Sequence, residues 1–119
     1  MAEETESIGR IEVAPEVLLT IVRQEVLNIR GVQKMAPVPA EVSNLFRRTS
    51  RRDGVLLDYG DNRLAFDLYV YMDPEVNLRE TSRAIQVAVI EAIDKMVGIP
   101  VDAVNVHVED VIYAQGQTA

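Results

Sequence analysis

Residues 77–111 constrain the fold more than any other stretch, because they combine a long amphipathic helix, a tight turn and an alternating strand. Asn77 stands three residues before Glu80, a spacing typical of a capping box at a helix N-terminus. Gly98 tolerates the left-handed conformation that ends a helix, and Pro100 cannot continue one. Between these limits, apolar residues recur on one helical face, at Ile85, Val89, Ala92, Ile93 and Met96.

The predicted helix carries more apolar surface than this single face. Val87, Ile90 and Val97 widen the stripe sideways. A broad contact with a sheet would explain the extra strip, and so would a contact with a subunit or partner.

The strand that follows has one apolar face and one polar face. A period of two places alternate side chains on opposite sides of a strand, so this strand is covered on one side only. A helix followed by a half-covered strand predicts two layers, with helices packed on one face of a sheet. Valines and polar residues alternate here: Val104, Asn105, Val106, His107, Val108 and Glu109.

The rest of the chain predicts a second helix and further strands. Weak alternation over residues 8–13 indicates an edge strand, and Ala14-Pro15-Glu16 then begins a helix that Arg30-Gly31 ends. A short strand over 32–38 precedes an irregular loop, residues 40–53. Strands over 55–59 and 64–71 flank Gly60-Asp61-Asn62, whose residue types suit a hairpin turn.

These elements predict an α+β fold of two layers. We expect a small antiparallel or mixed sheet with two helices on one face, in the order β-α-β-(loop)-β-β-α-β. The expected single domain spans residues 8–113, between a flexible acidic tail at 1–7 and a C-terminal tail at 114–119.

Charge and composition narrow the function classes. The net charge of −7 disfavours non-specific binding to nucleic acid or to an anionic membrane. No apolar run has the roughly 18 residues of a membrane span, and the acidic N-terminus is unlike a signal peptide. The absence of cysteine fits a reducing compartment. We therefore expect a cytoplasmic protein without direct membrane insertion.

The residues that carry chemistry are sparse in this sequence. The one histidine, His107, cannot supply the usual ligand set of a zinc site. No spacing suggests a catalytic triad, and no glycine-rich phosphate loop is present. We expect no enzymatic activity, no metal and no cofactor.

An arginine cluster is the strongest charge feature. The protein is acidic, yet one stretch of six residues contains four arginines: Arg47, Arg48, Arg51 and Arg52. Arginine binds phosphate and carboxylate groups bidentately. The cluster suits a docking loop for an acidic partner, a phosphate contact, or a loop in which Thr49 or Ser50 is phosphorylated. A solvated loop that pairs with the protein's own carboxylates is the plain alternative.

A second candidate surface lies on the polar side of the predicted sheet. Tyr69, Tyr71, Asn105 and His107 share this side with Asp67, and aromatic sheet faces stack bases in some RNA-binding folds. A contact with protein fits better, because the basic residues that a nucleic-acid backbone needs are absent nearby. An exposed or half-packed set of strand residues is the plain alternative.

Several stretches together resemble the alkaline shock protein family, also called the general-stress protein family. Residues 9–17 are similar to its opening strand and helix start, and Gly31-Val32, Met35 and residues 68–70 to its middle. The most specific match is the helix end at 92–98 followed by the Val-Asn-Val-His-Val stretch at 104–108. In place of the glycine-rich sequence of many members, this chain has Pro37, Pro39 and the arginine cluster.

The resemblance implies a bacterial, cytoplasmic α/β protein tied to envelope stress and alkaline tolerance. Some members of the family are held at the membrane by a separate anchor protein, and some are linked to fatty-acid synthesis. It implies no enzymatic activity.

We therefore expect a non-enzymatic interaction or scaffold protein that self-associates or docks a protein partner, such as a membrane anchor. The alternative is a nucleic-acid-binding module. The expected partner-binding residues are Arg47, Arg48, Arg51, Arg52, Tyr69, Tyr71, Asn105 and His107.

Overall fold

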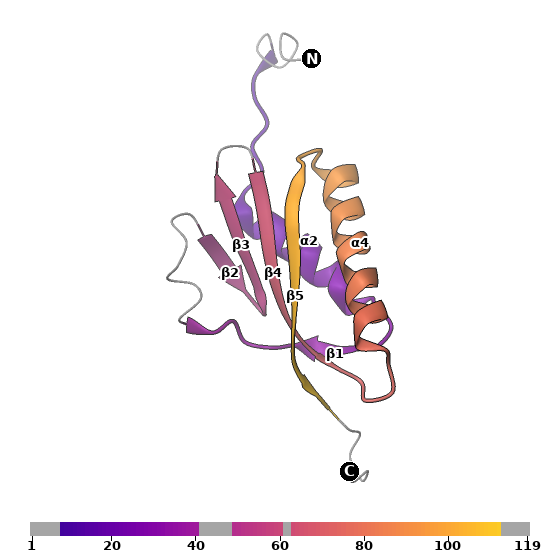
Figure 1. Ribbon diagram of the computed structural model, residues 1–119. Coiled ribbons are helices and arrows are strands. Elements are labelled where there is room, and N and C mark those ends of the chain that lie inside the picture. The colour runs from indigo at the N-terminus through magenta and orange to yellow at the C-terminus, as the bar shows by residue number, and fades with distance from the viewer. Residues whose placement is uncertain (1–7, 41–48, 61–62, 113–119) are drawn as a thin grey trace.

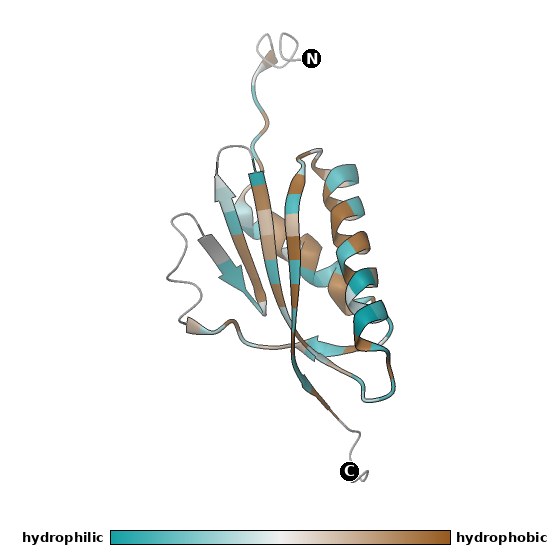
Figure 2. Cartoon of the chain, viewed as in Figure 1, coloured by the Kyte–Doolittle hydropathy of each residue, from teal (hydrophilic) through white to brown (hydrophobic). Residues whose placement is uncertain are grey.

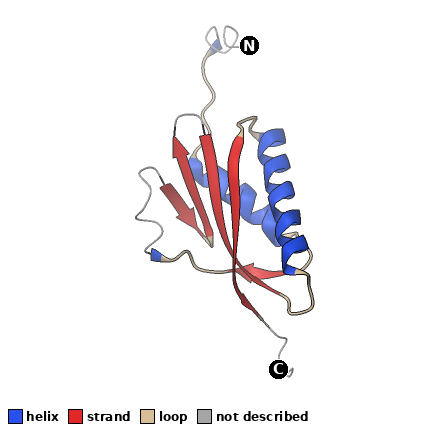
Figure 3. Ribbon diagram, viewed as in Figure 1, coloured by secondary structure: helices blue, strands red, loops and turns tan. Residues whose placement is uncertain are grey.

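Strand β4 (Arg63–Met72) is the centre of a five-stranded sheet in this computed structural model, which describes residues 8–40, 49–60 and 63–112. The labelled helices and strands of the described residues are arranged as Figures 1 and 3 show. In chain order they are α2 (Pro15–Leu27), β1 (Val32–Met35), β2 (Thr49–Arg52), β3 (Val55–Gly60), β4, α4 (Leu78–Met96) and β5 (Val101–Val111).

The sheet is mixed, and β4 has partners along both edges. Strand β3 pairs antiparallel with the first part of β4, and β1 pairs antiparallel with its last three residues on the same edge. Strand β5 lies parallel to β4 on the opposite edge, and β2 extends the sheet beyond β3. The long connection that a parallel pair needs is supplied by α4.

Both helices pack on one face of the sheet, as the sequence predicted. Figure 2 shows apolar residues recurring along β4 and β5, and the alternation in β4 places its large apolar side chains under the helices. The predicted α+β class is confirmed. The side chains of the core come from α2, α4 and the central strands, and include Val22, Val26, Phe66, Leu68, Val70, Ile85, Val89 and Ile93.

Helix α4 begins and ends where local signals predict. The Asn77 side chain accepts a hydrogen bond of 2.9 Å from the backbone N–H of Glu80, which satisfies one of the free donors of the first turn. Gly98, just beyond the helix, has a φ of +77°. Within the described residues, neither this helix nor any other has the length and apolarity needed to cross a membrane.

Two predicted segments differ from the structure. The edge strand predicted over residues 8–13 is not formed. Alternation makes a segment suitable for pairing, but a strand also needs a neighbouring strand to pair with. The predicted loop 40–53 contains β2, and Asp53-Gly54 joins it to β3 with φ angles of +50° and +81°. Arg52 faces Val55 across this two-residue turn, as in a tight β-hairpin.

The predicted hairpin between β3 and β4 is borne out by the pairing of Gly60 with Arg63. Its turn residues, Asp61 and Asn62, lie outside the described residues. The strand predicted over 32–38 ends at Met35.

Candidate functional site

The outer face of the sheet, opposite the helices, carries a compact cluster on β4 and β5. The rings of Tyr69 and His107 stack with their centroids 4.4 Å apart and their planes within 9°. The His107 Nε2 lies 2.8 Å from an Asp67 carboxylate oxygen. Parallel pairing produces this arrangement, because Tyr69 faces His107 and Asp67 faces Asn105 in the register. The sequence therefore grouped these residues correctly.

A sheet covered by helices on one face only would leave Tyr69 open to a partner on the other face, but the structure buries Tyr69. Only 3% of the residue is accessible, and Leu56 on the same face is fully buried. The Tyr69 backbone bonds to Ala36 and Gly54, so two other segments meet it from the side. Burial raises the pKa of the Tyr69 hydroxyl above its ordinary 10.0, and the nearby Asp67 and Glu109 carboxylates raise it further.

The remaining residues of the outer face are more accessible. Asn105 is exposed and His107 is half-buried. Tyr71 is half-buried, and the Lys34 ammonium lies 5.4 Å from its ring centroid, within cation–π range. A partner on this face would therefore meet the outer side of His107, Asn105 and the Lys34–Tyr71 pair, while Tyr69 supports His107 from below.

The arginine cluster is divided by the fold. Arg51 and Arg52 are neighbours in β2, so their side chains leave opposite faces of the sheet. Arg51 shares the outer face with Leu56, Asp67 and Asn105, which follow one another across the register. Three strand spacings separate it from Asn105, or about 14 Å. Arg47 and Arg48 lie outside the described residues.

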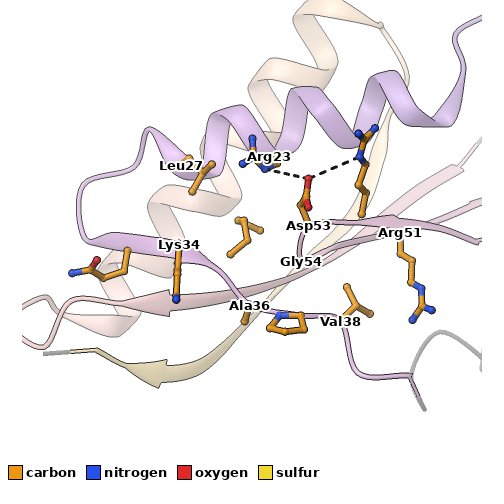
Figure 4. Close-up of a pocket in the computed structure, with 12 residues that line it drawn as sticks. Arg23, Leu27, Lys34, Ala36, Val38, Arg51, Asp53 and Gly54 are labelled. Carbon is orange, nitrogen blue, oxygen red and sulfur yellow. Dashed lines mark ion pairs between the residues drawn. The ribbon is translucent and has the colours of Figure 1, made fainter.

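A hollow of about 840 Å³ opens between α2, the segment after β1 and the β2–β3 hairpin. Four of its lining residues are cationic: Arg23, Lys34, Arg51 and Arg52. Asp53 is the acidic residue among the described residues that line it. Figure 4 shows Arg23 and Asp53 on the α2 side, whereas Lys34 and Arg51 point away from α2. The lining carries a clear excess of positive charge in a protein whose net charge is −7.

The internal pairing in this hollow is loose. Arg23 Nε lies 3.5 Å and Arg52 Nε 3.9 Å from the same Asp53 oxygen. Arg23 Nε is buried yet makes no hydrogen bond within the described part of the chain. Because exposed ion pairs of this kind contribute at most about 1 kcal/mol, an incoming carboxylate can compete for these guanidinium groups.

Sequence reasoning missed Arg23, Lys34 and Asp53 as members of one surface. The Asp53-Gly54 pair was the available signal, since Asp-Gly between two strand-like segments predicts a tight hairpin. That hairpin would have placed Arg51 and Arg52 on a strand. Their approach to Arg23 on α2 depends on tertiary packing, which no local pattern encodes.

Comparison with known proteins agrees with the fold and the resemblance. The model of the alkaline shock protein 23 family, described as having a cell envelope-related function, matches residues 3–113. An uncharacterized protein of Streptococcus pyogenes serotype M6, Spy1535, is 32% identical over 109 residues, which cover 91% of this chain and 83% of that protein. The uncharacterized protein YqhY of Bacillus subtilis is 23% identical over 109 residues, covering 91% of this chain and 81% of YqhY.

Solved structures share the architecture at low sequence identity. The structure of MamM-CTD H285A superposes with a TM-score of 0.52 at 14% identity, covering 83% of this chain and 100% of that chain. MamM CTD H264E gives a TM-score of 0.51 at 14% identity, covering 82% and 95%. At such identity the likeness concerns the fold alone.

Proposed function

The chain belongs to the alkaline shock protein 23 family, with its cell envelope-related function, and from this premise we propose that it is a non-enzymatic interaction protein. It self-associates or docks a protein partner, and through that partner it serves the cell envelope. The proposal places it in the cytoplasm, with a membrane-anchor protein as the candidate partner that holds it at the membrane.

The observation that carries the docking part is the cationic hollow beside the β2–β3 hairpin. Among the described residues, Arg23, Lys34, Arg51 and Arg52 line it, and Asp53 is the acidic residue in that lining. Guanidinium groups bind carboxylates bidentately and are common at protein interfaces. An acidic segment of a partner protein therefore matches this surface better than an apolar or basic segment would.

Affinity purification from cells tests this proposal. Tagged wild-type protein and the variant R51E/R52E are compared, with R79E/R83E as the control because Arg79 and Arg83 are exposed on α4, away from the hollow. We expect R51E/R52E to lose partners that both the wild type and the control retain. An unchanged set of partners in R51E/R52E would remove the hollow from the proposal.

The alternative is a nucleic-acid-binding module. The cations of the hollow favour it, whereas the burial of Tyr69 counts against it. Stacking a base requires an open aromatic face, and Tyr69 is 3% exposed with His107 against its ring. Binding of single-stranded RNA that weakens steeply with salt, and that is lost in R51E/R52E, would favour this alternative over protein docking.

A further inference from the structure

Residues 9–13 form an arm that carries exposed apolar side chains and makes no contact with another element among the described residues. Ile8 is 87% exposed and Ile11 is 89% exposed, which is unusual for isoleucine in a folded protein. Arg10 and Glu12 form an ion pair of 3.1 Å, so alternate side chains project on one side as they do in a strand. The backbone of residues 9–13 makes no hydrogen bond within the described parts of the chain.

The arm is directed away from the sheet of its own subunit. Pro15 begins α2, and the residue before a proline is driven to an extended conformation, as the Ala14 φ of −68° and ψ of 145° show. Figure 1 shows the arm leaving the top of the molecule, beyond the ends of β3 and β4. No strand edge in the described part of its own subunit lies beside the arm, so the candidate edge is one on another molecule.

Strand β5 offers such an edge. It has 11 residues, and β4 is its only partner strand among the described residues. Figure 1 shows it at the rim of the sheet, beside α4. The opposite rim, β2, has four residues. The Val104 carbonyl of β5 accepts a hydrogen bond from the Gln86 side chain, but no described strand pairs with this edge. Another extended segment can therefore satisfy backbone donors and acceptors along it.

An apolar strip lies next to this edge. Gln86 Nε2 on α4 donates a hydrogen bond of 2.9 Å to the Val104 carbonyl of β5, which places that side of the helix at the strand. Ile90 follows Gln86 by four residues and so shares this side of the helix. Ile90 is 43% exposed, and Val106 on β5 is half-buried. One added strand would cover both.

We propose that residues 9–13 of one copy add as a strand to the outer edge of β5 in a second copy. Ile11 and Val13 then lie on the helix side of the sheet, against Ile90 and Val106. Arg10 and Glu12 lie on the outer face, where Glu109 offers a carboxylate to Arg10. This inference rests on the self-association part of the proposed function and names its partner, a second copy of this chain, and its surface.

Light scattering after size-exclusion chromatography tests the contribution of the arm. I11D introduces a charge at a position that contributes nothing to the core, and L78D is the matched control at another exposed apolar residue, in the first turn of α4. We expect I11D to raise the dissociation constant of the dimer about tenfold or more, a loss of roughly 1.4 kcal/mol, whereas L78D leaves it unchanged. A wild-type protein that is monomeric at high concentration would overturn the proposal, as would equal association of I11D and wild type.

Crosslinking tests the position of the arm. The native chain has no cysteine, so single cysteines report unambiguous contacts. I11C is mixed with I90C under mild oxidation, and in parallel with D53C at the opposite rim. We expect a covalent heterodimer with I90C and several-fold less with D53C. A stronger crosslink to D53C would overturn the assignment to β5.

The two proposals fail separately. R51E/R52E leaves the arm and β5 intact, so we expect it to dimerise like the wild type. Monomeric wild-type protein that still captures partners through the hollow would overturn strand addition alone. A dimer that is lost in I11D, together with partners unaffected by R51E/R52E, would overturn hollow docking alone.

Discussion

Gly54 is the residue at which three segments of the chain converge. Its φ is +81°, and a Cβ at this position would lie 2.5 Å from the Ala36 carbonyl oxygen and 2.9 Å from that of Tyr69. Both contacts are with backbone, which cannot rotate away. Glycine is therefore required here for conformation and for space.

A substitution at Gly54 should be more costly than one at a glycine that needs conformation alone. Gly98 is the matched control, because its φ is +77° and nothing lies within 4 Å of its added Cβ. We expect G98A to lose about 1 kcal/mol of unfolding free energy and G54A to lose more, about 3 kcal/mol. Chemical denaturation measures both, and equal losses would contradict the close approach.

We expect the unfolding free energy to fall at alkaline pH because the pKa of Tyr69 is raised in the folded state. Burial raises its pKa above 10.0 in the folded state, whereas the unfolded chain ionises near 10.0. The folded state then retains a proton that the unfolded state releases. The stabilisation is complete below about pH 10 and is lost as the pH rises from there to the folded-state pKa.

Y69F removes this ionisation, so its unfolding free energy should fall less steeply than that of the wild type above pH 10. Y71F is the matched control on the same strand face. Denaturant unfolding across an alkaline pH series measures the slopes, and parallel curves for wild type and Y69F would exclude Tyr69 as the source.

At the scale of elements, local signals predicted α4, β4 and β5 because capping residues and periodicity lie within each segment. They failed at β2, whose four residues carry no apolar alternation, and at residues 8–13, which alternate but form no strand. Periodicity also shows which face a side chain takes, but not what covers that face. The burial of Tyr69 therefore could not be predicted from the sequence.

The N-cap of α4 should contribute measurably to the unfolding free energy. N77A removes the acceptor for the Glu80 N–H, and we expect a loss of about 1 kcal/mol in unfolding free energy. N105A, at an exposed position on β5, is the matched control and should change stability by less than about 0.5 kcal/mol. Thermal and denaturant unfolding would reveal the difference; similar values for the two variants would argue against the cap.

At the scale of the whole molecule, charge is unevenly distributed. The protein has a net charge of −7, yet cations from α2, β1 and β2 gather around one hollow. No single segment contains this set. The sequence identified the arginines as a candidate site, but only the packing of α2 and β1 against the hairpin adds Arg23 and Lys34 to them.

Docking of an acidic segment at this hollow should depend on salt. The Debye length falls from about 10 Å at 0.1 M to about 3 Å at 1 M ionic strength, so attraction between exposed charges weakens strongly over that range. We expect the captured partner to elute as salt is raised. A complex that is stable at high salt would indicate an apolar interface instead.

The parallel pairing of β5 with β4 has a consequence for biosynthesis. Strands β1 to β4 all precede α4 in the chain, and β5 follows it as the last of the described strands. During translation the edge of β4 that pairs with β5 therefore stays unpaired until residue 111 has left the ribosome. Until then the nascent protein can recruit a foreign strand in place of its own, so the final segment is the one whose delay most endangers correct folding.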